Sequence, residues 1–261
     1  MQELERLLQQ GQEALEIGDA AAAVKLGRQA VQAFADAASA HVLLGEALAE
    51  AGKESEALTA LHRARQLDPE NLDTLYALGD VSFEAQQAEE ALKLYEEILR
   101  LDPQQADAWV SAGLVHFHCE RMEQAEQAFR KALAIEPDST FALNSLGDAC
   151  YSQGRNEEAL ACYRQVIAAD PQDAQAHYNL AEMYYDTGEL EAAEKECQET
   201  LRLDPTFGFV HLTLGNIELD REHPREALHH FQEFLLHERS PAAKEIRDEV
   251  AAVVEGLRAE L

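Results

Sequence analysis

Few residues of this chain stand at spacings that could support catalysis or metal binding. His229, Glu233 and His237 recur four residues apart, which places them on one face of a helix, where imidazole nitrogens and a carboxylate could hold a metal ion. Helix surfaces often produce this spacing without any metal, so the pattern alone predicts no metal site. His116 and His118 are two residues apart and point to nearly opposite sides of a helix, so they cannot chelate one ion together.

The motifs that mark common enzymes are also missing from the sequence. It contains no G-x-x-x-x-G-K-[ST] loop for phosphates, no G-x-G-x-x-G loop for dinucleotides and no H-E-x-x-H zinc motif. No serine lies in a nucleophile-elbow sequence. We therefore predict that the chain is not an enzyme, and that it has neither catalytic residues nor a cofactor.

The charge and composition limit the partners and the compartment. The sequence has 21 Lys and Arg against 50 Asp and Glu, a formal net charge of −29, and such a surface repels nucleic acid. No stretch approaches the about 20 apolar residues that span a bilayer. The first residues lack the basic start of a signal peptide, and the 4 cysteines form no C-x-x-C pair. We expect a cytoplasmic protein with reduced thiols and no membrane insertion.

The elements that position any site come from an internal repeat. Prolines recur at intervals of 34 residues, at Pro69, Pro103, Pro137, Pro171 and Pro205. On this register the array covers residues 1–241 and contains seven units without an insertion, namely 4–37, 38–71, 72–105, 106–139, 140–173, 174–207 and 208–241. Glycine stands at the eighth position of all units but one, and alanine at the twentieth position of every unit. Such periodicity indicates a repeat architecture.

Each unit is predicted to be a pair of helices joined by a tight turn. Apolar residues recur at helical spacing, as in Leu75, Leu78 and Val81. The glycine at the eighth position would let the second helix lie close to the first, with the alanine at the twentieth position as its small partner. A glycine at the fifteenth position of four units suits the turn, because a positive φ is cheap only for glycine.

These columns resemble the tetratricopeptide repeat (TPR) family. The unit at 106–139 has Trp109, Gly113, Ala125, Phe129 and Pro137 where the family has an aromatic, a glycine, an alanine, an aromatic and a proline. The resemblance covers residues 4–241 and implies an all-α fold, a right-handed superhelical α-solenoid of seven helix-turn-helix repeats. The absence of insertions hints at a bacterial protein.

The last residues, 242–261, carry an apolar stripe at helical spacing, made of Ile246, Val250, Val253, Val254, Leu257 and Leu261. We interpret this segment as a C-terminal capping helix that shields the last repeat from water. The alternative is a helix for self-association.

The resemblance also implies that the first helix of each repeat lines a concave groove. The residues expected there in the central units are Asp73, Tyr76, Asp80, Phe83, Glu84, Asp107, Val110, Leu114, Phe117, Phe141, Asn144, Asp148, Tyr151, Tyr178, Glu182, Tyr185 and Asp186. From the second unit to the seventh, the first thirteen positions contain no Lys or Arg. An acidic and aromatic lining attracts cations. We therefore predict an interaction scaffold whose groove binds a basic, partly apolar segment of a partner protein.

Two alternatives to this hypothesis stay open. The acids could merely keep the groove soluble while the aromatic side chains fill gaps between repeats. The chain could also be a self-assembling structural or assembly-factor TPR protein, of a coat, pilus or secretion machinery, that uses its end repeats and the helix at 242–261. His41, His177 and His211 occupy the position where the family packs an aromatic residue, so we expect them to be structural.

Overall fold

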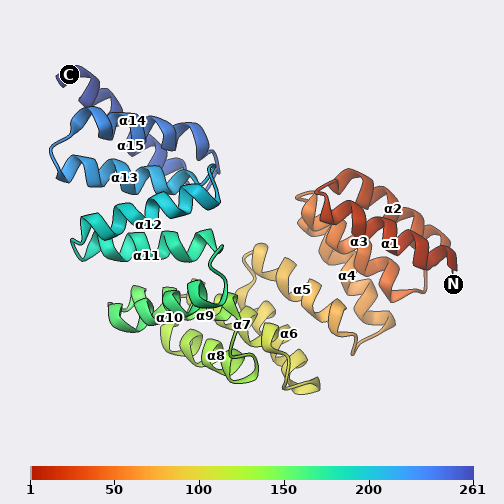
Figure 1. Cartoon of the computed structure of the whole chain (residues 1–261). Coiled ribbons are helices and arrows are strands. Elements are labelled where there is room, and N and C mark those ends of the chain that lie inside the picture. The colour runs from red at the N-terminus through yellow and green to blue at the C-terminus, as the bar shows by residue number, and fades with distance from the viewer. Residues whose placement is uncertain (1) are drawn as a thin grey trace. The chain divides into compact units, whose positions relative to one another are not determined.

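The structure of the chain is a computed structural model that describes residues 2–261, and over this range it is an all-α solenoid without strands (Figure 1). The helices are α1 Gln2–Glu16, α2 Ala20–Ala33, α3 Ala38–Glu50, α4 Glu54–Leu67, α5 Leu72–Glu84, α6 Ala88–Leu101, α7 Ala106–His118, α8 Met122–Ile135, α9 Thr140–Ser152, α10 Asn156–Ala169, α11 Ala174–Asp186, α12 Leu190–Leu203, α13 Gly208–Asp220, α14 Pro224–His237 and α15 Lys244–Glu260. Helices α1 to α14 pack in consecutive pairs. None of the described helices is long and apolar enough to cross a bilayer.

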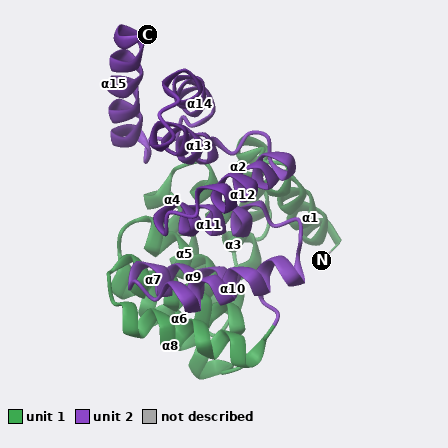
Figure 2. Ribbon diagram, turned by 60° about the vertical axis from the view of Figure 1, so that its left-hand side comes forward, with its two compact units in different colours: residues 1–137 green, residues 138–261 purple. Residues whose placement is uncertain are grey.

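The chain divides into two compact units, Met1–Pro137 and Asp138–Leu261 (Figure 2). The first unit contains α1 to α8 and the second contains α9 to α15. Helix α15 belongs to the second unit and packs on α14, where Val250, Val254 and Leu257 are buried together with Phe231 and Phe234. This packing buries half of the apolar stripe noted at 242–261, whereas Ile246, Val253 and Leu261 are exposed.

In four helix pairs, an aromatic ring of the second helix packs directly against the glycine of the eighth column. A Cβ atom at Gly79 would lie 2.6 Å from Cε1 of Tyr95, and Gly113, Gly147 and Gly215 face Phe129, Tyr163 and Phe231 in the same way. Only glycine leaves room for these rings, which are at most 2% exposed. In these four pairs, the atoms nearest to an added Cβ belong to the aromatic ring and not to the alanine at the twentieth position.

The turn within each pair contains a residue in the left-handed conformation, as predicted for the glycines. Gly52 has φ 68° and Gly154 has φ 72°. Gln86 adopts φ 59° at the same position of its repeat, although this conformation is costly for a residue with a side chain. Its N–H donates to the carbonyl oxygen of Phe83 at 2.9 Å, and the next N–H, of Gln87, donates to that of Ser82 at 2.8 Å. These two bonds form a Schellman motif that satisfies the end of α5.

We expect the Gly79→Ala substitution to destabilise the first unit by about 1–3 kcal/mol, because the new methyl group overlaps the Tyr95 ring. The matched control is Gly256→Ala in α15, where no described atom lies within 4 Å of an added Cβ and alanine should stabilise the helix by about 1 kcal/mol. Urea unfolding followed by circular dichroism measures both changes. A Gly79→Ala variant as stable as the original chain would contradict the packing described above.

Candidate functional site

In the first unit, α3 and α5 line a pocket of about 400 Å³. Its lining consists of Glu46, Ala49, Glu50, Asp73, Tyr76, Ala77, Asp80, Val81 and Glu84, which we call the acidic pocket. Four of these residues were expected in the groove of their repeat, namely Asp73, Tyr76, Asp80 and Glu84, and Glu46 and Glu50 come from the same columns of the preceding repeat. None of the described lining residues is Lys or Arg, so five carboxylates share this space with one phenol.

The acidic pocket partly desolvates its carboxylates, although several of them are open to solvent on one side. Burial, followed by the charges of Asp73 and Asp80, raises the pKa of Glu46 above its ordinary value. Burial and the charge of Asp80 also raise the pKa of Glu84. Burial and then the charge of Asp107 raise the pKa of Tyr76 to about 12, so its hydroxyl keeps its proton. The like charges repel one another in this pocket, and a bound cation would relieve that repulsion.

In two repeats, a tyrosine of the second helix donates a hydrogen bond to an aspartate of the first helix. The hydroxyl of Tyr95 donates to Oδ1 of Asp80 at 2.6 Å, and that of Tyr163 donates to Oδ1 of Asp148 at 2.7 Å. Sequence analysis missed these partners, although each of the two tyrosines follows an aspartate by 15 residues. The repeat that has Phe129 in place of the tyrosine has no acid at the corresponding position. The ring that fills the hairpin core therefore also orients a groove carboxylate.

In the second unit, acids expected in the groove accept hydrogen bonds from a neighbouring repeat. Asn179 donates to Asp148 at 3.1 Å, and the hydroxyl of Thr213 donates to Glu182. Tyr151 donates its hydroxyl to Asp186. Burial raises the pKa of Glu182, while the Thr213 hydrogen bond opposes this shift. These acids thus help to hold neighbouring first helices in register, besides lining a surface.

Aromatic residues expected in the groove occupy varied environments. In the first unit, the Phe83 ring meets His118 edge to face with centroids 5.4 Å apart, and Phe117 is half-buried. In the second unit, the Tyr178 ring lies 4.9 Å from that of Phe207. Burial, followed by a hydrogen bond with Asp220, raises the pKa of Tyr185 to about 12. The aromatic lining is therefore partly engaged in contacts between repeats.

The remaining expected residues range from buried to fully accessible. Val110 is only 3% exposed, so it lies inside the wall of its helix pair and offers little surface to a ligand. Leu114 is half-buried and Asp107 is exposed. Asn144 donates to Asp173 at 3.2 Å, and Phe141 is 59% exposed. Phe141 is thus an apolar residue of the expected groove that solvent reaches freely.

Two of the fourth-column histidines are buried and make polar contacts, which fits the structural role expected of them. Nε2 of His41 lies 2.9 Å from the carbonyl oxygen of Ala35, and Nδ1 of His177 lies 2.7 Å from Oε2 of Glu196. Both histidines are buried. Among the cysteines, Cys119 is half-buried, whereas Cys150, Cys162 and Cys197 are buried.

Comparisons with known proteins agree with this fold. Residues 1–253 match the family model described as the cilia and flagella-associated protein 70 C-terminal domain. A solved TPR protein from Parabacteroides merdae ATCC 43184 is similar over 98% of this chain and 100% of that chain, with a TM-score of 0.77 and 20% identity. Yeast Tom70 is similar over 98% of this chain, with a TM-score of 0.75 and 17% identity. No curated protein sequence matches the chain.

A further solved structure, YrrB, is described as a TPR protein with an unusual peptide-binding site. It is similar over 70% of this chain and 95% of its own, with a TM-score of 0.52 and 22% identity. At these identities the likeness concerns the fold alone. The chain spans about half of the Tom70 chain, of which 54% is covered.

We expect the acidic pocket to make the first unit less stable as the pH rises from about 4.5, the ordinary carboxyl value, towards neutrality. A carboxyl whose pKa is raised on folding binds more protons in the folded chain than in the unfolded chain, so the free energy of unfolding falls as the pH rises. The double variant Glu46→Gln, Glu84→Gln should therefore be more stable than the original chain at neutral pH, with a difference that shrinks towards pH 4.5.

Urea unfolding over this pH range measures the effect. The control variant Glu70→Gln, Glu123→Gln removes the same charge from exposed positions outside the pocket lining. An equal stabilisation in the control variant would assign the effect to net charge and not to the pocket.

Proposed function

Because the chain belongs to the TPR family of the cilia and flagella-associated protein 70 C-terminal domain, we propose that it is a protein-interaction scaffold whose acidic groove binds a basic, partly apolar segment of a partner protein. Proteins of this family and fold are generally scaffolds without enzymatic activity. The described peptide-binding site of YrrB gives a precedent for ligand binding by this fold.

The observation that carries the proposal is the acidic pocket. Its five carboxylates surround Tyr76 without a cation among the described lining residues. The ammonium or guanidinium group of a Lys or Arg would be attracted by the acids and by the face of the Tyr76 ring, a contact of about 0.5–2 kcal/mol. Its alkyl chain would lie against Ala49, Ala77 and Val81. The pocket therefore suits a basic side chain on an extended or helical segment.

Preformed geometry also supports binding of such a segment. Asp80 is already oriented by Tyr95, so the pocket needs little reorganisation to receive a cation. The two helices that carry the acids pack on buried side chains of their partner helices, α3 on Leu61 and α5 on the Tyr95 ring. The partner segment would then bear most of the ordering entropy, and a scaffold of this kind favours flexible ligands.

We expect the full chain to bind an unstructured fluorescent peptide that alternates Lys with Leu, and not a matched peptide that alternates Glu with Leu. The Glu46→Gln, Glu84→Gln variant should weaken binding roughly 5- to 30-fold, because two ion pairs of about 0.5–1 kcal/mol each are lost. Raising the salt concentration should weaken binding further, since salt screens the attraction. Fluorescence anisotropy measures each affinity.

The Glu70→Gln, Glu123→Gln variant serves as the control and should bind like the original chain. The proposal fails if both variants lose affinity equally, since the effect would then be one of net charge. It also fails if binding is indifferent to salt or if the two peptides bind alike.

Exposed apolar residues on α15 favour a second candidate function, self-assembly. On α15, Ile246 is 38% and Val253 is 40% exposed, and Leu261, directly after the helix, is 50% exposed. If α15 mediates association, the Ile246→Gln, Val253→Gln variant should have a lower mass by light scattering while its circular dichroism stays unchanged. A monomeric original chain, or an equal mass for both proteins, would leave α15 with only a capping role.

A further inference from the structure

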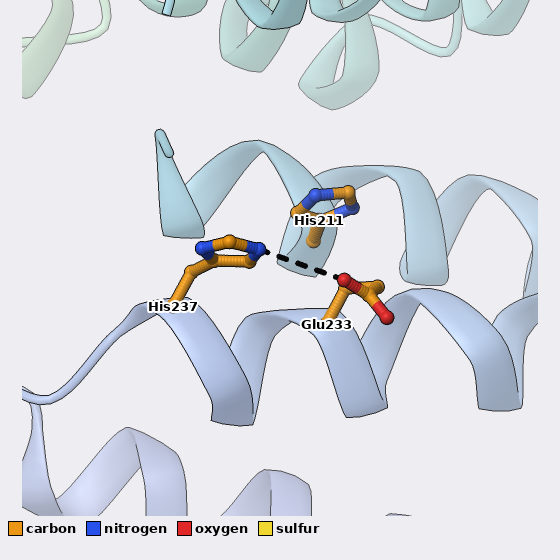
Figure 3. A group of neighbouring side chains, drawn as sticks. All are labelled: His211, Glu233 and His237. Atoms are coloured by element: carbon orange, nitrogen blue, oxygen red, sulfur yellow. Dashed lines mark ion pairs between the residues drawn. The ribbon is translucent and has the colours of Figure 1, made fainter. Parts of the chain in front are cut away.

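Two imidazoles and a carboxylate meet in the last helix pair of the second unit (Figure 3). They belong to His211 of α13 and to Glu233 and His237 of α14, and one possible ligand atom from each lies within 4.8 Å of the other two. Nε2 of His237 lies 3.6 Å from Oε2 of Glu233. The rings of His211 and His237 are stacked with centroids 5.9 Å apart. The third member is thus His211, from the neighbouring helix, whereas His229 lies outside the group.

We propose that His211, Glu233 and His237 form a binding site for a divalent transition-metal ion of the Zn²⁺ class. Imidazole nitrogen and carboxylate oxygen are ligands that Zn²⁺ accepts, at about 2.0–2.2 Å. Ligand atoms at that distance in a tetrahedral site stand about 3.4 Å apart. The three side chains therefore need only small rotations to close around an ion, and a water molecule would take the fourth position.

His230 provides the outer partner that a metal-binding histidine usually has. Its Nδ1 lies 3.2 Å from Nδ1 of His211, so one of these two atoms carries the shared hydrogen. In the tautomer in which His211 donates, its Nε2 has a free lone pair for a metal ion. Hydrogen bonds of this kind orient the ring and select the tautomer in known metal sites. His230 thus makes His211 a more defined ligand than an isolated surface histidine.

The electrostatics of the cluster suit a metal ion. Glu233 supplies a negative charge, and its Oε2 lies 3.6 Å from Nε2 of His237. A carboxylate beside two imidazoles is a donor set that favours a cation of the Zn²⁺ class.

The site would fasten the open end of the last helix pair. His211 lies in the first turn of α13, and His237 is the final residue of α14, so a shared ion would join the start of one helix to the end of the other. This end is opposite the turn that connects the two helices. Bound metal would therefore stabilise the pair just before the chain continues into α15.

The test is a titration of the full chain with Zn²⁺ by isothermal calorimetry. We expect a one-to-one complex, and a loss of affinity of at least about tenfold in each of the variants His237→Asn and Glu233→Gln. The matched control is His229→Asn, on the same helix but outside the group, which should bind like the original chain. Mg²⁺, which prefers oxygen ligands, should not compete.

A second readout is thermal unfolding, in which Zn²⁺ should raise the transition temperature of the original chain and a chelator should reverse the shift. Circular dichroism establishes that the variants fold, and both altered side chains are partly exposed. Absence of zinc binding overturns the proposal. Equal affinity in the original chain and both variants overturns it as well, because zinc would then be held elsewhere, for example by Cys119. An equal loss in His229→Asn would overturn the assignment of these three ligands.

Discussion

The contact between a glycine of the first helix and an aromatic ring of the second is the interaction on which the central helix pairs depend. At Gly79 there is no room for a methyl group, because the Tyr95 ring occupies its place. Burial of such a ring contributes about 1.5–3 kcal/mol and sets how closely the helices approach. Since the ring spans the pair, its hydroxyl reaches the first helix at Asp80. Core packing and the orientation of a groove acid thus have one cause.

Several acids expected in the groove accept hydrogen bonds from neutral donors. Tyr163 and Asn179 donate to Asp148, and Thr213 donates to Glu182. Neutral donors fix the position of a carboxylate without cancelling its charge, so the surface stays negative. Arginine and lysine pair with other acids, as Arg65 does with Glu97 on the second helices. Charge is thus separated along each repeat, since the first helices from α3 to α13 contain no Lys or Arg.

The same repeat register produces a different chemistry in the last helix pair. The fourth column holds His41 and His177 in buried hydrogen bonds, whereas His211 in that column meets the histidines of α14. The difference arises from the second helix, which carries His230, Glu233 and His237 in this repeat alone. A constant backbone arrangement therefore allows single repeats to acquire separate sites through a few side chains.

By itself, the sequence determined the helices, their turns and the columns that face the core. Apolar residues recur at helical spacing within a 34-residue period, and turn glycines such as Gly52 and Gly154 mark where one helix of a pair ends. Tertiary structure alone decided which side chains meet across helices. The pairing of Asp80 with Tyr95 and the approach of His211 to Glu233 join residues 15 and 22 positions apart. Such contacts depend on the distance and rotation between two helices and on side-chain rotamers, and a linear pattern of residue types specifies none of these.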